Sequence, residues 1–277
     1  MERYSRKSII IFVLLQTILY VSFLILDISK KSISLSNEIK FLIIILCFCF
    51  AFFSKRNASK GILFCLKAGL FFTVISDLCI LILDYYIYGV MTFIIVQQLY
   101  GVRISLNKYN QNSINQNSIN QNNNQNNNQN RDYPNNNNHI SKKESSDLVL
   151  SIIIRFLLQV LLAGAICFLL QSLGVVLETL LVISVFYFIC ILTNTVRALW
   201  AMFHSPPNSG IFLFAIGMFL FLLCDINVGL FNLTGFISLP KDVYNAVYSI
   251  SSLLMWTFYA PSQVLIALST QKLDHGA

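Results

Sequence analysis

The segment FFTVISDLCILILDYY (residues 71–86) places Asp77 in the middle of an otherwise apolar stretch. A stretch of this length and composition is typical of a transmembrane helix, where a carboxylate is costly to bury. The same arrangement recurs 148 residues later at Asp225, in IGMFLFLLCDINVGLFNL (residues 216–233). Because the costly residue is duplicated, we interpret the two aspartates as a pair.

The composition of the chain indicates an integral membrane protein. Its 277 residues are 56% hydrophobic and 11% charged, whereas soluble domains average about 25% charged residues. The first apolar run is too long for a cleaved signal segment and is expected to remain as a span. The net charge is +7, and the basic residues lie beside apolar segments. This position favours a role in membrane topology over nucleic-acid binding. The seven cysteines form no CxxC pair, so buried free thiols are expected.

Apolar windows predict an all-α fold, a polytopic membrane bundle of eight helices. An even number of spans places both chain ends on one side of the membrane. That side receives thirteen Lys and Arg residues, whereas the other side receives four. Basic loops stay in the cytosol, so cytosolic termini are predicted. The sequence does not define the organelle, and the endoplasmic reticulum or another endomembrane is the expected location. The predicted spans are residues 8–28, 38–53, 61–83, 86–105, 148–170, 174–195, 210–232 and 245–268.

A polar, low-complexity tract separates the first four spans from the last four. It reads NQNSINQNSINQNNNQNNNQN over residues 110–130. Such a tract buries too little apolar surface to offset its ordering entropy. We therefore expect a disordered cytosolic loop over residues 108–146, between a first membrane half (1–107) and a second (147–277). Self-association through the tract is the alternative interpretation.

The surroundings of the two aspartates also match. Gly69 and Gly217 each precede an aspartate by eight residues, and Asp84 and Asn232 each follow one by seven. Seven residues are nearly two helical turns, which predicts that each aspartate shares a helix face with the polar residue that follows. The two halves are therefore interpreted as a weak parallel 4+4 repeat, with the two carboxyls at similar depth around one cavity.

Two interpretations of the carboxyl pair stay open at this point. An intramembrane aspartate can join neighbouring helices through hydrogen bonds. Alternatively, two close carboxyls in a low dielectric cannot easily both ionise, so that one remains protonated and the pair provides an acid and a base. The matched context favours the second interpretation, because intramembrane ionisable groups usually mark function.

Other chemistry is sparse in the sequence. His139, His204 and His275 all lie in predicted loops or tails, so neither a metal site nor a cofactor is predicted. The sequence has no GxSxG, GxGxxG or P-loop motif. Arg155 and Lys67 are expected to snorkel or to pair with a carboxylate. The remaining polar residues inside the spans are expected to form packing hydrogen bonds, namely Gln16, Gln97, Gln98, Asn194, Arg197 and Gln263.

Taken together, the motifs resemble the YhhN family of eight-span membrane proteins, the lysoplasmalogenases. The resemblance rests on GLFFTVISDLCIL (69–81), GMFLFLLCD (217–225) and YAPSQVLIALS (259–269), in this order. Lys40 resembles an early lysine of the family. This chain has QQLY (97–100) where the family often has HLxY, so a glutamine replaces the histidine. The resemblance covers nearly the whole chain outside the Asn-rich tract.

The resemblance implies hydrolysis of the vinyl-ether bond of a lysoplasmalogen to a fatty aldehyde and glycerophosphocholine or glycerophosphoethanolamine. Protonation of the vinyl-ether β-carbon gives an oxocarbenium ion that water captures, and a carboxylic acid with a carboxylate suits these steps. Asp77 and Asp225 are the predicted catalytic residues, with acid and base unassigned. The expected partners are a lysophospholipid from the bilayer and membrane lipids, without nucleic acid and with an undefined oligomeric state. The predicted substrate-binding residues are Lys40, Gln97, Tyr100, Tyr259 and Gln263.

Two other classes of protein remain open from the sequence. A small-solute or proton-coupled transporter also combines repeats with midplane carboxylates, although neither aspartate span contains the Pro or Gly interruption of a broken helix. A non-catalytic lipid-binding protein would keep the fold and lose activity through Gln97. Aldehyde release by purified protein in detergent separates the enzyme from both alternatives, because transport requires two compartments.

Overall fold

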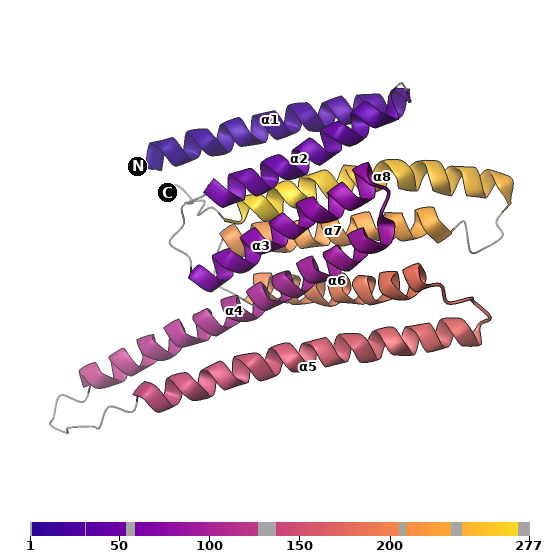
Figure 1. The fold of residues 1–277 in the computed structure, drawn as a ribbon. Coiled ribbons are helices and arrows are strands. Elements are labelled where there is room, and N and C mark those ends of the chain that lie inside the picture. Colours follow the sequence, from indigo (N-terminus) through magenta and orange to yellow (C-terminus); the bar gives the residue numbers. More distant parts are fainter. Residues whose placement is uncertain are drawn as a thin grey trace.

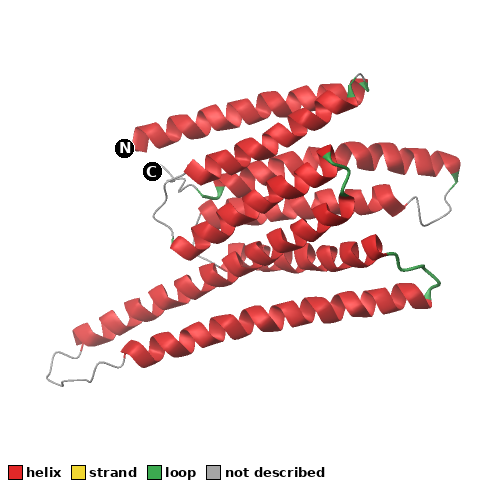
Figure 2. Cartoon of the chain, in the orientation of Figure 1, coloured by secondary structure: helices red, strands yellow, loops and turns green. Residues whose placement is uncertain are grey.

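The computed structural model describes residues 2–30, 32–53, 59–126, 137–204, 209–233 and 240–270. These residues form a bundle of helices without a strand in the described ranges (Figure 2). Eight of the helices are long and apolar enough to cross a membrane, which confirms the predicted polytopic membrane bundle. The elements of Figure 1 are α1 (Glu2–Ser29), α2 (Ile33–Phe53), α3 (Lys60–Asp77), η1 (Leu78–Ile82), α4 (Tyr86–Asn126), α5 (Asn137–Ser172), α6 (Thr179–His204), α7 (Ser209–Leu233) and α8 (Lys241–Leu268).

The helices alternate in direction, so that α1 begins and α8 ends at the same end of the bundle (Figure 1). This end is called the termini end below, and the other is called the opposite end. α7 and α8 pack together most extensively, followed by α3 and α4. α5 makes its main contacts with α4 and α6 only, and it lies at the edge of the bundle (Figure 1).

The structure shifts the predicted sixth span towards the termini end. The sequence predicts residues 174–195, whereas the helix runs over Thr179–His204. It begins later because Gly174 adopts a φ of +80° in the turn that precedes it. It ends later because the polar Asn194 and Arg197 bond to α4, so these residues lie inside the span. Arg103 and Arg197 lie within the spans Tyr86–Gln111 and Thr179–His204, although both are counted among the thirteen basic residues that indicate the cytosolic side.

The second and fourth helices are also longer than their predicted spans. The second begins at Ile33 instead of residue 38, because Ser36 and Lys40 on its first turns bond to Asp27 of α1. The fourth continues to Asn126, and α5 begins at Asn137, in the region that the sequence predicts to be disordered. Extension of an existing helix avoids the nucleation cost, which offsets the low helix propensity of Asn, and Gln is itself a good helix former. Residues 127–136 of the predicted loop lie outside the described residues.

The two matched glycines lie at the closest contacts between helices. A Cβ atom on Gly69 of α3 would overlap the ring of Tyr100 on α4. A Cβ atom on Gly217 of α7 would press on the backbone oxygen of Ser262 and on the side chain of Ile266, both on α8. The duplicated glycine thus permits close packing in two corresponding helix pairs, α3 with α4 and α7 with α8.

The helix that carries Asp77 changes its winding directly after this residue. Leu78–Ile82 form a π-helical segment, and Asp84 has a φ of +56°, which ends the helix. The prediction that Asp77 and Asp84 share a helix face is therefore wrong, because seven residues equal two turns only in continuous α-helix. Asp84 is exposed and accepts a bond from the Tyr86 hydroxyl at 3.5 Å. Asn232 is exposed too, and its amide donates to the Val228 carbonyl at 2.8 Å.

Candidate functional site

The first carboxyl of the predicted pair lies deep in the bundle. Asp77 is only 3% exposed, and its Oδ2 accepts a hydrogen bond from the Tyr259 hydroxyl of α8 at 2.6 Å. This length lies at the short end of the range of about 2.5–3.0 Å that is usual for O–H···O hydrogen bonds. Tyr259 is buried as well, so the bond is shielded from solvent.

The second carboxyl has a matching partner. Asp225 Oδ2 accepts a hydrogen bond from the hydroxyl of Tyr187 on α6, also at 2.6 Å. Tyr187 is buried, whereas Asp225 is partly exposed. Asp77 lies 17 residues from Lys60 and Asp225 lies 16 residues from Ser209, so both carboxyls stand about 25 Å along their helices from the termini end.

The two bonded pairs belong to one cluster, which we call the carboxyl–tyrosine cluster (Asp77, Asp225, Tyr187, Tyr259 and Cys224). Tyr187 interacts electrostatically with both carboxyls, and Tyr259 interacts with Asp77 and with Tyr187. The thiol of Cys224 interacts with both carboxyls. The four helices α3, α6, α7 and α8 thus bring these titratable groups into one cluster.

An aromatic wall holds the tyrosine rings of this cluster in position. The ring of Phe93 on α4 lies 5.7 Å from the Tyr187 ring and 6.4 Å from the Tyr259 ring. Phe221 lies 5.3 Å from Tyr259, and Trp256 lies at the same distance from it, nearly perpendicular. Aromatic contacts of this kind, edge-to-face for Phe93 and Trp256 on Tyr259 and tilted for the others, restrict each ring, so the hydroxyls stay directed at the carboxyls.

Pro261 lies two residues after Tyr259 in α8. Proline has no backbone N–H, so the carbonyl four residues earlier, that of Thr257, loses its helical donor. The hydroxyl of Tyr20 on α1 donates to this carbonyl at 3.2 Å. The Tyr20 hydroxyl thereby supplies the donor that the Thr257 carbonyl lacks in the helix beside the cluster.

The turn that follows Asp77 is fastened to α4. The hydroxyl of Ser76 donates to the Gly89 carbonyl at 2.5 Å, and a Cβ atom on Gly89 would overlap the Ile80 side chain. The π-helical segment between these contacts adds backbone width directly after Asp77. Such segments occur frequently at functional sites.

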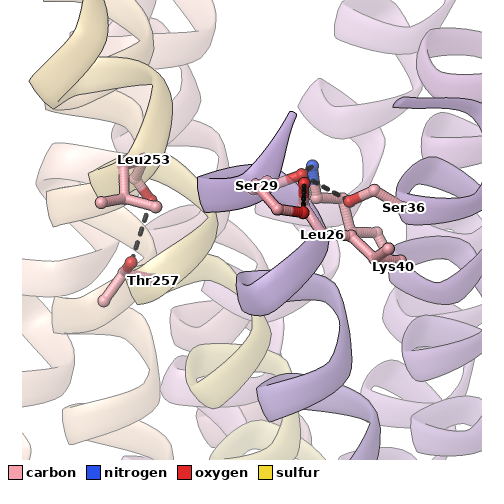
Figure 3. Close-up of polar contacts among 7 residues, drawn as sticks. Leu26, Ser29, Ser36, Lys40, Leu253 and Thr257 are labelled. Carbon is pink, nitrogen blue, oxygen red and sulfur yellow. Dashed lines mark hydrogen bonds and ion pairs between the residues drawn. The ribbon is translucent and has the colours of Figure 1, made fainter. Parts of the chain in front are cut away.

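Lys40, a predicted substrate-binding residue, lies in a second polar group at the junction of α1, α2 and α8. Its ammonium forms an ion pair with Asp27 Oδ2 at 2.9 Å, and the Ser36 hydroxyl donates to Asp27 Oδ1 at 2.5 Å. Figure 3 shows Ser36 and Lys40 beside the last turn of α1. The ammonium also stands 4.9 Å from the centre of the Trp256 ring, a cation–π contact. Because Trp256 packs against Tyr259, Lys40 is linked to the carboxyl–tyrosine cluster through one aromatic ring.

The other predicted binding residues lie closer to the termini end than the carboxyls. Gln97 is fully buried one turn after Phe93, and the amide of Asn194 donates to its backbone oxygen at 2.6 Å. Tyr100 is fully buried over Gly69 and 5.5 Å from the Phe214 ring. Gln263 is buried one turn after Tyr259. All three line the core below the cluster and contribute no hydrogen bond to the two bonded carboxyl–tyrosine pairs.

Sequence reasoning missed Tyr187, Asp27 and Trp256. Tyr187 carries no signal in its own segment, because its partner Asp225 is 38 residues away. Asp27 and Lys40 are 13 residues apart across a short hairpin, so their opposite charges were a detectable signal. The cluster as a whole provides two carboxyls, each bonded to a buried phenolic donor. This set of groups can exchange protons with a bound molecule and can stabilise a positive charge.

Comparison with models of protein families, with curated proteins and with solved structures finds no match to this chain. The class that the fold defines is therefore an integral, multi-pass helical membrane protein with a buried carboxyl–tyrosine cluster.

Proposed function

We propose that the protein is a lysoplasmalogenase-like hydrolase of the YhhN type, which cleaves the vinyl-ether bond of lysoplasmalogens. The observation that carries this proposal is the pair of carboxyls, each bonded to a buried tyrosine hydroxyl at 2.6 Å, in one cluster. The ordered motifs around Asp77, Asp225 and Tyr259 support the same family.

The proposed reaction uses the two carboxyls in complementary roles. One carboxylic acid transfers its proton to the β-carbon of the vinyl ether, and the π electrons of the double bond form the new C–H bond. The other carboxylate stabilises the resulting oxocarbenium ion and accepts a proton from the water that attacks it. The carboxyl that took the proton from water then donates it to the leaving glycerol oxygen, and the other carboxylate accepts the proton of the hemiacetal hydroxyl. The hemiacetal thus collapses to the aldehyde and the glycerol hydroxyl, and both carboxyls return to their initial protonation states. Tyr187 and Tyr259 orient the carboxylate oxygens.

The substrate fits the surroundings of the cluster. A single-tailed lysophospholipid enters laterally from the bilayer, and its reacting bond reaches Asp225, the partly exposed carboxyl. Its head group lies towards the opposite end, where Lys40 and Trp256 provide a cation and an aromatic face. Gln97, Tyr100 and Gln263 complete the proposed binding residues from the core side.

The proposed topology places the termini end in the cytosol. The basic residues outside the spans gather at that end, as the positive-inside rule requires. Protease added to sealed vesicles is expected to cut within residues 110–130 only when the cytosolic face is accessible. Cleavage from the luminal face alone would reverse this topology.

The experiment that tests the function is aldehyde release by the purified protein in detergent. We expect turnover of a lysoplasmalogen and none of the matched 1-alkyl ether lysolipid, which has no double bond to protonate. A transporter and a non-catalytic lipid-binding protein both predict no aldehyde. Absence of aldehyde from folded, monodisperse protein with choline and ethanolamine substrates would refute the proposal.

A further inference from the structure

The helix at the edge of the bundle docks through a polar face. Of the α5 residues whose burial is described, only Arg155, Gln159 and Ala163 are buried, at a spacing of four. A helix that faces lipid on most sides has no hydrophobic reason to present an arginine and a glutamine inward. The inward face of α5 therefore suggests a polar role.

The polar side chains of this face form a chain of hydrogen bonds across three helices. Arg155 Nη2 donates to Gln98 Oε1 at 2.8 Å, and Gln98 Nε2 donates to Gln159 Oε1 at 3.0 Å. Gln159 Nε2 then donates to Thr193 Oγ1 at 2.7 Å. These bonds fix the Arg155 guanidinium between α4 and α6.

The guanidinium of Arg155 keeps donors that have no acceptor. Arg155 is 8% exposed, and its Nε and Nη1 atoms have no hydrogen-bond partner among the described residues. The sequence predicts that Arg155 snorkels or pairs with a carboxylate. Among the described residues the structure shows neither, since the guanidinium is buried and its Nη2 donates to an amide oxygen and a backbone carbonyl of Gln98.

A second guanidinium faces the same place. Arg197 Nη2 donates to Ser105 Oγ at 2.7 Å, and its Nη1 lies 3.5 Å from the Gly101 carbonyl. Arg155 and Arg197 interact electrostatically. Gly101 makes their approach possible, because a Cβ atom at this position would occupy the space of the Arg155 guanidinium. Two like charges thus lie beside Gly101 in a low dielectric, and Arg155 keeps two donors without a partner among the described residues, an arrangement that an anion stabilises.

The depth of the two arginines indicates the source of the anion. Arg155 lies nine residues from Ser146 and Arg197 seven from His204, the termini ends of their spans, or about 13 Å and 10 Å along the helices. The α5 span of 27 residues measures about 40 Å, roughly 10 Å more than the hydrocarbon core. Both guanidiniums therefore lie a little below the head groups of the leaflet at the termini end.

We propose that Arg155 and Arg197 form a binding site for the phosphate group of a phospholipid from the leaflet at the termini end, between α4, α5 and α6. Guanidinium donors match phosphate oxygens in pairs, and the lateral position of α5 gives access from the bilayer. This lipid is distinct from the proposed substrate, whose reacting bond lies at the carboxyl–tyrosine cluster nearer the opposite end. The site does not depend on the proposed hydrolysis, because its test measures binding.

The test is native mass spectrometry of the detergent-purified protein with phosphatidic acid and with diacylglycerol of the same acyl chains. We expect phosphatidic acid to bind the wild type more tightly than diacylglycerol does. Arg197→Gln, which leaves the inward face of α5 intact, is expected to raise the Kd for phosphatidic acid at least about tenfold. Lys67→Gln is the matched control, because Lys67 is partly exposed, donates to the Phe52 carbonyl on α2 and lies outside the site.

Thermal unfolding provides the second measurement. Phosphatidic acid is expected to raise the Tm of the wild type, and Gly101→Ala, which preserves all charges, is expected to abolish this rise. If Arg155 serves only to join helices, the variants lower the Tm without lipid and keep the same lipid-dependent rise. An unchanged lipid-dependent rise in the variants would overturn the proposal. Equal binding of diacylglycerol and phosphatidic acid would also overturn it, as would an equal rise in Tm with inorganic phosphate alone.

Discussion

Replacement of Tyr259 by phenylalanine isolates the contribution of one hydroxyl to the carboxyl–tyrosine cluster. The ring of residue 259 is held by Phe93, Phe221 and Trp256, so phenylalanine keeps this packing and loses only the 2.6 Å bond to Asp77. The residue is buried, so bulk water does not replace the lost donor. Leaving a buried hydrogen-bond acceptor without its donor costs about 1–3 kcal/mol. Expressed fully in the transition state, at about 1.36 kcal/mol for each factor of ten in rate, this cost lowers kcat by roughly 5- to 150-fold.

The assay for this prediction is aldehyde release per mole of folded protein, with folding measured by thermal unfolding. Tyr187→Phe is the matched second variant, since it removes the equivalent bond to Asp225. Tyr248→Phe is the control on the same helix as Tyr259, because Tyr248 is exposed and its ring packs on Phe231 and Tyr244. Wild-type kcat in Tyr187→Phe and Tyr259→Phe with wild-type folding would refute the role of the tyrosines. A loss of Tm with unchanged activity per folded molecule would assign them to helix association.

Two further predictions concern the duplicated motif. Asp77→Asn and Asp225→Asn are each expected to lower kcat by about 10²-fold or more, with a double variant little worse than either because the two act as one unit; near-wild-type turnover in one of them would remove that aspartate from the site. Gly69→Ala and Gly217→Ala are each expected to destabilise the bundle by about 1–3 kcal/mol through overpacking, measured as a lower Tm. Gly164→Ala is the control, because a Cβ atom at this position would meet nothing within 4 Å, and an equal loss of Tm there would contradict the packing argument.

The sequence predicts the number and type of helices because a bilayer demands long apolar segments with internal hydrogen bonds. The prediction of span boundaries is least accurate where polar residues are buried against another helix. The predicted sixth span ends at residue 195 because the polar Asn194 and Arg197 lower the local hydropathy. Their bonds to Gln97 and Ser105 keep them inside, and these partners are known only from the fold.

The two carboxyls of the candidate site could be predicted because a carboxylate is costly to bury in a membrane span. A single aspartate inside an apolar segment is therefore visible in the sequence itself, as Asp77 and Asp225 are. A tyrosine in the same setting is ordinary, and Tyr187 becomes notable only when α6 brings its hydroxyl to Asp225. The π-helical segment after Asp77 has no sequence signal such as Pro or Gly, because Leu78–Ile82 are all apolar residues or cysteine. The segment directly follows Ser76, whose hydroxyl donates to the Gly89 carbonyl of α4, a contact that only the fold reveals.

The origin of the two tyrosines explains why a duplicated motif yields an asymmetric site. The matched glycines pack within each half, α3 on α4 and α7 on α8. The hydroxyls do not follow this symmetry, because Tyr187 and Tyr259 both belong to the second half. Asp77 is thus bonded across the two halves, whereas Asp225 is bonded within one. Asp77 is consequently buried at the contact between the halves, and Asp225 remains partly exposed. Two carboxyls with similar sequence surroundings and different exposure are what a division into acid and base requires, and this difference arises only when both halves are assembled.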